Sequence, residues 1–123
     1  CLGLTPYATC VRIGNALADV VASHGRDVLI LASTDMSHYL PADTAETKDR
    51  MALERIEALD PEGLYRTVID NDISMCGFIP TTVSLVAAKA LGATEARLIR
   101  YGNSGDASGD YERVVGYAGF VIR

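Results

Sequence analysis

Two residues that can transfer protons, Asp35 and His38, lie three positions apart in a polar stretch, residues 34–39. Histidine is the side chain whose unperturbed pKa lies nearest to neutral pH, so an imidazole beside a carboxylate can take up and release a proton during turnover. The alternative is a structural role, with Asp35 capping a turn and His38 exposed on a loop. The spacing permits a contact between the two side chains without requiring it.

A third candidate is Cys76, which is followed by Gly77 and, at Pro80, by a residue suited to the first turn of a helix. A thiol near a helix N-terminus lies at the positive end of the helix dipole, which favours the thiolate. A thiolate is a nucleophile or a metal ligand, and Gly77 would let a substrate or ion approach the backbone. The alternative is a small residue buried where a loop meets a helix.

Composition excludes several classes of function. The net charge of -5 argues against nucleic-acid binding, which depends on lysine and arginine displacing counterions. The longest apolar run, residues 28–32, is far shorter than the roughly 18 residues of a membrane span. The three cysteines lack the spacing of a disulfide framework or a zinc site, so Cys1 and Cys10 are expected to be buried or free thiols in a cytoplasmic protein.

The apolar spacing predicts the elements that position these residues. Residues 27–33 read as a strand buried on both faces, central and parallel in its sheet, with residues 34–39 leaving its carboxyl end. The last two strands are close enough in the chain to pair antiparallel. The order predicts a layered α/β fold, a mixed sheet flanked by helices, in a single domain of 123 residues. The expected helices are 9–24, 43–59, 61–70 and 80–91, and the expected strands are 27–33, 96–101 and 114–122.

Three stretches together resemble a known family: LILASTDMSHY at 29–39, MCGFIPTTVSL at 75–85, and residues 101–120, which begin YGNSGD and end VGYAGF. They are similar to the C-terminal half of the Memo family, called AmmeMemoRadiSam system protein B in bacteria and archaea. That family resembles the LigB-type class III extradiol dioxygenases in fold. The three stretches occur in the order and at the spacing found in the family, and together they extend over nearly the whole chain.

The resemblance implies a non-haem metal pocket and a dioxygenase-type oxidoreductase activity on a small molecule. In the dioxygenases two histidines and a carboxylate hold iron(II), and a further histidine is the acid/base; the Memo family has a cysteine in the carboxylate's place. Cys76 matches that metal-ligating cysteine, His38 the acid/base histidine, and Asp35 the acidic residue before it. A thiolate is softer than a carboxylate and shifts the preference toward copper(I), zinc or a more covalent iron site, so the resemblance implies non-haem iron or copper in the full-length protein.

The chain also departs from the family pattern. The family's two other ligating histidines have no counterpart here, because the one remaining histidine, His24, belongs to a different position. The chain is therefore expected to be the C-terminal half of a Memo-like domain and, alone, to hold no metal tightly. Half a sheet would expose an apolar edge, which predicts self-association.

Two other functions fit the same residues. One is a non-catalytic module that binds a peptide or partner protein in this pocket. The other is a thiol-dependent hydrolase with Cys76, His38 and Asp35 as a triad.

Overall fold

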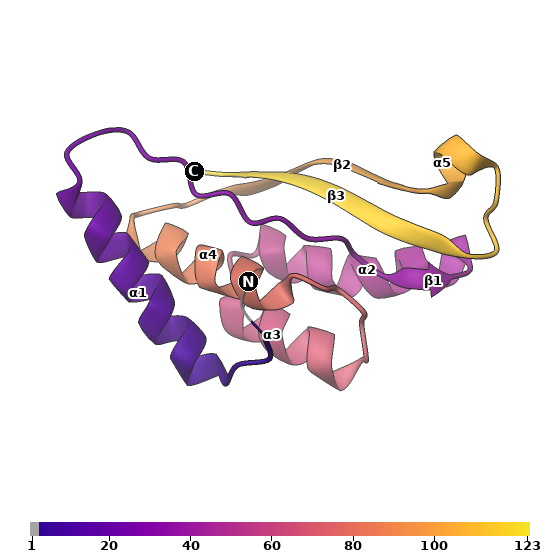
Figure 1. Cartoon of the computed structure of the whole chain (residues 1–123), viewed down its shortest axis with the longest axis horizontal. Helices are drawn as coiled ribbons and strands as arrows, with labels where there is room; N and C mark the ends of the chain where they lie inside the picture. Colours follow the sequence, from indigo (N-terminus) through magenta and orange to yellow (C-terminus); the bar gives the residue numbers. More distant parts are fainter. Residues whose placement is uncertain (1–2) are drawn as a thin grey trace.

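The protein has a layer of helices packed against one face of a three-stranded sheet (Figure 1). The computed structural model describes residues 3–123. In chain order the elements are α1 (Tyr7–Ser23), β1 (His38–Leu40), α2 (Ala42–Glu57), α3 (Pro61–Asp70), α4 (Phe78–Ala90), β2 (Ala96–Asn103), α5 (Gly105–Ser108) and β3 (Val114–Ile122). The layered α/β fold expected from the sequence is confirmed.

Helices α2 and α3 form the base of the main core. Asp60 accepts a hydrogen bond from the backbone N–H of Gly63, which caps α3 at its start, where Pro61 occupies the first turn. The apolar side of α2 faces α3 and the sheet. The buried residues of this core come from both helices, from the α3–α4 loop, from α4 and from the sheet: Met36, Ala52, Leu53, Ile56, Leu59, Leu64, Val68, Ile73, Met75, Leu85 and Ala96.

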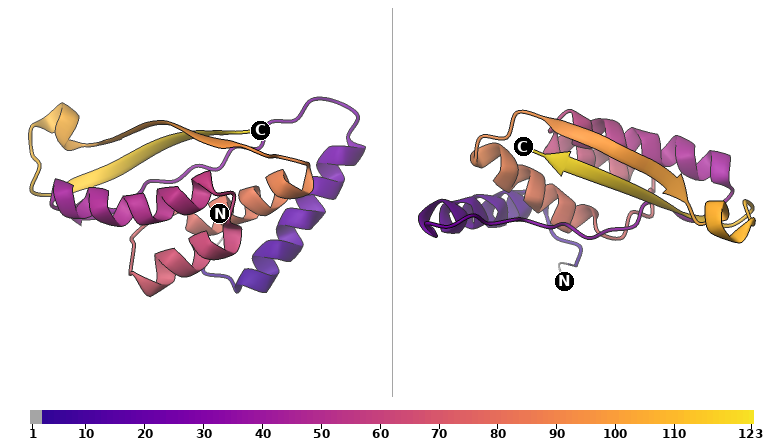
Figure 2. Two further views of the ribbon diagram at one scale, coloured as in Figure 1. Left: turned by 180° about the vertical axis from the view of Figure 1, so that it is seen from behind. Right: turned by 90° about the horizontal axis from the view of Figure 1, so that it is seen from above.

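Helix α1 packs on α4 rather than on the sheet, and Figure 2 shows it at the edge of the helical layer. Its buried residues are small: Cys10, Gly14 and Ala18. A Cβ added at Gly14 would lie 2.6 Å from the Cβ of Val86 and 2.8 Å from the carbonyl oxygen of Val83, so the two helices approach as closely as their backbones allow. Burial raises the pKa of the Cys10 thiol above its ordinary value. Cys1 lies outside the described residues.

The sheet has the order β1-β3-β2, and both pairings are antiparallel. Strands β2 and β3 pair along their whole length, from Ala96 opposite Ile122 to Asn103 opposite Gly116. Strand β1 pairs only with the start of β3, where His38 lies opposite Val115. The antiparallel pairing expected for the last two strands is confirmed, and the loop between them contains the short helix α5, which the sequence did not predict.

The expected central strand at residues 27–33 is wrong for this structure. The segment is extended but pairs with no strand among residues 3–123. Leu29 is 87% exposed and Leu31 is 82% exposed, whereas a strand covered on both faces would bury them. The physical reason is that a strand's hydrogen bonds come from neighbouring strands, and the described part of the chain supplies none here.

Among residues 3–123, no helix is both long and apolar enough to cross a membrane.

Candidate metal centre

The site lies where two loops meet. One is the turn that carries Asp35 and leads into β1, whose first residue is His38, and the other joins α3 to α4 and carries Ser74 and Cys76. Cys76 comes directly before Gly77, the N-cap of α4, as the sequence predicted. The helix dipole of α4 therefore favours negative charge at the Cys76 position.

His38 is held by two hydrogen bonds to one residue of the other loop. Its backbone N–H donates to Ser74 Oγ at 2.8 Å, and its ring Nδ1 lies 2.7 Å from the carbonyl oxygen of Ser74. A carbonyl oxygen only accepts, so this contact assigns the ring proton to Nδ1. The lone pair of neutral His38 is then on Nε2, which faces Asp35 with an Nε2–Oδ2 distance of 3.8 Å.

Cys76 is tied to the same turn through Thr34 and the backbone of Asp35. Its Sγ accepts a hydrogen bond from the backbone N–H of Asp35 at 3.4 Å. The hydroxyl of Thr34 accepts from the backbone N–H of Gly77 at 2.8 Å and donates to the carbonyl oxygen of Asp35 at 2.8 Å. This hydroxyl therefore links the two loops at the point where the sulfur lies, which fixes the sulfur relative to the turn.

One ligand atom each from Asp35, His38 and Cys76 lies within 4.8 Å of the other two. We call these residues the Asp35–His38–Cys76 cluster. The side chain of His38 is 23% exposed and that of Asp35 is 49% exposed, so the cluster is open to solvent on one side. The structure thus brings together all three residues selected from the sequence. His24, by contrast, is exposed and forms the C-cap of α1.

Comparison with known proteins settles which family this arrangement belongs to. A family model described as Memo-like protein matches residues 1–121. The chain belongs to the Memo family. The resemblance found in the sequence is therefore confirmed.

Relatives of this Memo-family chain occur in archaea and bacteria. It is 46% identical over 123 residues to a MEMO1 family protein of Methanopyrus kandleri, a match that covers 100% of this chain and 44% of the relative. It is 41% identical over 116 residues to a MEMO1 family protein of Aquifex aeolicus, covering 94% of this chain and 43% of the relative. The chain spans less than half the length of these relatives.

Beneath the cluster, the Memo-family chain has a buried carboxyl group that the sequence reasoning missed. Asp49 of α2 is fully buried and accepts hydrogen bonds from the backbone N–H of Ser37 and from the hydroxyl of Tyr101, each at 2.8 Å. Ser37 lies between Asp35 and His38 in the chain, so its hydrogen bond to Asp49 fixes the turn that carries them. The available signal was a lone acidic residue among the buried positions of α2, which otherwise hold Ala45, Ala52, Leu53 and Ile56.

Tyr101 gives this family member a testable dependence on alkaline pH. Burial raises the pKa of the Tyr101 phenol above its ordinary value of 10.0, and the hydrogen bond to Asp49 and the charge of Asp49 raise it further. A pKa raised on folding contributes stability below pH 10, about the pKa of the unfolded state, and that contribution is lost as pH rises toward the folded pKa. We expect the free energy of unfolding to fall more steeply above pH 10 in the wild type than in Tyr101→Phe. The difference between the two slopes should correspond to roughly one proton that the folded state keeps and the unfolded state loses.

Urea unfolding between pH 8 and pH 11.5 measures this difference. Tyr117→Phe, on the exposed side of β3, is the control and should follow the wild type. Parallel profiles for the wild type and Tyr101→Phe would show that the pKa of the Tyr101 phenol is not raised in the folded state, which contradicts the prediction.

Proposed function

We propose that Cys76 is a metal ligand in an oxidoreductase site of the extradiol dioxygenase type, with a small molecule as substrate. In this site His38 transfers protons and Asp35 supports it. The observation that carries the proposal is the Asp35–His38–Cys76 cluster itself, whose three donor atoms lie within 4.8 Å of one another. Two separate segments of the chain supply these atoms, and the hydrogen bonds of Ser74 and Thr34 hold the segments together.

The donor set fits a transition metal. The Cys76 thiolate prefers softer metals than a carboxylate does, such as copper(I), zinc or iron, and of these iron and copper can supply the redox chemistry of an oxidoreductase. A stable site uses three or four protein ligands, and with His38 reserved for proton transfer this chain supplies fewer. The remaining ligands would come from outside these 123 residues. When bound, the metal would supply redox chemistry.

The protein's own groups then position a proton at a defined atom. The hydrogen bond from Nδ1 to Ser74 leaves Nε2 of His38 as the atom that accepts and releases the substrate proton. Asp35, 3.8 Å away, stabilises the imidazolium that forms when Nε2 takes up the proton. The partial exposure of both side chains lets a small molecule approach from solvent.

The geometry favours this function over a thiol-dependent hydrolase. A hydrolase needs its base hydrogen-bonded to the nucleophile. In the described part of the chain, the Cys76 sulfur has its contacts with Thr34 and the backbone of Asp35, and no hydrogen bond joins it to Nε2 of His38. The cysteine and histidine are neighbours around a common space, which is the arrangement of groups that share a bound ion or substrate.

Cobalt(II) binding tests the ligand assignment. In a Cys1→Ser background, titration with cobalt(II) is expected to produce a thiolate-to-cobalt charge-transfer band, with weak affinity because ligands are missing. The band should disappear in Cys76→Ser and persist in Cys10→Ala, which removes a thiol buried elsewhere. His38→Ala should keep the band, since we assign the imidazole to proton transfer. A band unchanged by Cys76→Ser, or no band at saturating cobalt, contradicts the assignment.

A further inference from the structure

The extended segment, residues 28–33, has the side-chain alternation of a strand but lacks a strand's neighbours. Leu29 and Leu31 are exposed, while Ile30 and Ala32 between them are partly buried. Within residues 3–123 no backbone hydrogen bond involves this segment. Its peptide groups are therefore free to pair with another chain segment, and its exposed leucines cost free energy as long as water surrounds them.

Strand β3 has a matching free edge on the other side of a groove. The segment and β3 begin as neighbours, since the N–H of Met36 donates to the carbonyl oxygen of Gly116 and the N–H of Gly116 donates to that of Ser37, both at 2.9 Å. They then separate. Beyond Gly116, this edge of β3 pairs with no strand among the described residues, because β1 pairs only at the start of β3. The structure thus has two unpaired edges facing one groove.

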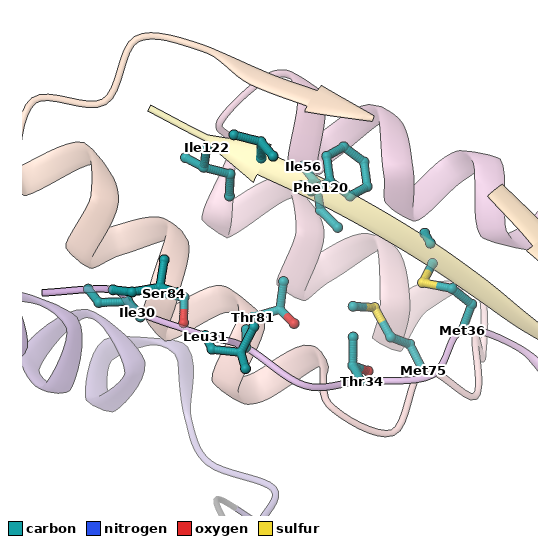
Figure 3. A pocket seen from close by; sticks show the side chains of 14 residues that line it. Ile30, Leu31, Thr34, Met36, Ile56, Met75, Thr81, Ser84, Phe120 and Ile122 are labelled. Carbon is teal, nitrogen blue, oxygen red and sulfur yellow. The ribbon is translucent and has the colours of Figure 1, made fainter. Parts of the chain in front are cut away.

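The groove is apolar and about 250 Å³ in volume (Figure 3). Ile30 and Leu31 lie on one side of it, and Phe120 and Ile122 of β3 lie on the other. Ile56 of α2 also lines the groove. So do two methionines, Met36, which follows Asp35 in the chain, and Met75, which precedes Cys76. A second hollow of about 310 Å³ shares four lining residues with the first and extends the groove toward the end of α4: Leu29, Ile30, Ser84 and Ile122.

We propose that this groove binds an extended apolar strand of polypeptide, supplied by the part of a Memo-family protein that lies outside these 123 residues. An apolar small molecule would cover the free peptide groups without pairing them, which is costly, whereas a strand pairs them while its side chains fill the hollow. The relatives show where such a strand can come from, because the chain covers 44% of the Methanopyrus kandleri protein. More than half of that relative is available to supply it.

Hydrogen exchange with an added fragment tests the proposal. The probe is the portion of the Methanopyrus kandleri relative outside the matched residues, mixed with this chain as a separate polypeptide. We expect a one-to-one complex in sedimentation and at least tenfold slower amide exchange at residues 28–33 and at the free edge of β3. Absence of a complex, or protection confined to other segments, overturns the proposal.

A matched pair of lysine substitutions places the binding surface. Leu31→Lys should weaken fragment binding at least tenfold while leaving the fold intact, because this side chain is 82% exposed in the free chain. Val20→Lys, at a 63% exposed position of α1, should bind as the wild type does. Equal binding by both variants contradicts the assigned surface. Concentration-dependent protection of residues 28–33 without the fragment would assign the groove to a second copy and overturn the proposed source.

Discussion

Replacing Asp49 with alanine is expected to lower the free energy of unfolding by about 3–6 kcal/mol. The carboxyl group is fully buried and accepts one hydrogen bond from Ser37 and one from Tyr101. Hydrogen bonds to a carboxylate contribute about 1.5–3 kcal/mol each, and the alanine would leave both donors without a partner. Urea denaturation followed by circular dichroism measures the loss.

Two further variants separate the lost hydrogen bonds from the lost charge. Asp49→Asn keeps the volume and one good acceptor, so its loss should be about half that of Asp49→Ala. Glu54→Ala removes an exposed carboxylate from the same helix and should change stability by less than about 0.5 kcal/mol. A loss below about 1 kcal/mol for Asp49→Ala would mean that Ser37 and Tyr101 find other partners.

Replacing Gly14 with leucine should detach α1 from α4 and lower the free energy of unfolding by about 3 kcal/mol or more. The Cβ alone would lie 2.8 Å from the carbonyl oxygen of Val83, and this backbone atom moves only if α4 moves. We expect hydrogen exchange to accelerate throughout α1 and its packing face on α4, while the core formed by α2 and α3 stays protected.

Gly14→Ala and Ala16→Leu are the controls for this prediction. The alanine variant introduces the same first clash but none of the further side-chain atoms of leucine, and it gains about 1 kcal/mol of helix propensity over glycine, so its net loss of stability should be smaller. Ala16 is exposed on α1, and a leucine there adds the same side chain away from α4. If Gly14→Leu is as stable as Ala16→Leu, then the close approach of the two helices is not required for the fold.

The sequence predicted the elements whose signals are local. Helix α3 has the predicted bounds because Asp60 and Pro61 mark its start by their own chemistry. Strand β3 also has the predicted bounds, because residues 114–122 are mostly apolar or aromatic without interruption by a charged residue. The buried face of α1 is harder to predict, since the large apolar residues Ile13 and Leu17 are only partly buried while Gly14 and Ala18 are buried. Small residues contribute little hydropathy, yet they determine how closely two helices pack.

What the sequence could not predict depends on partners far along the chain. The strand expected at residues 27–33 is wrong here, because pairing requires a neighbouring strand that local patterns do not reveal. In the candidate site, Asp35, His38 and Cys76 were selected by residue type, by their positions at the ends of predicted elements and by the family resemblance. Asp49 and Thr34 were missed, because their importance comes from hydrogen bonds that span 12 and 43 positions. Residue type identifies candidate reactive groups, and tertiary contacts identify the groups that hold them.

The contacts that assemble the cluster also set when it can form during folding. The hydrogen bonds between its two loops join residues 36 to 43 positions apart, with α2 and α3 in between. Closing a loop of that length costs chain entropy before any contact compensates for it, so short-range structure forms first. The sulfur of Cys76 therefore acquires its neighbours only after α2 and α3 have docked. A nascent or partly folded chain carries the same residues but has no cluster, so the donor set exists only in molecules that have completed this step.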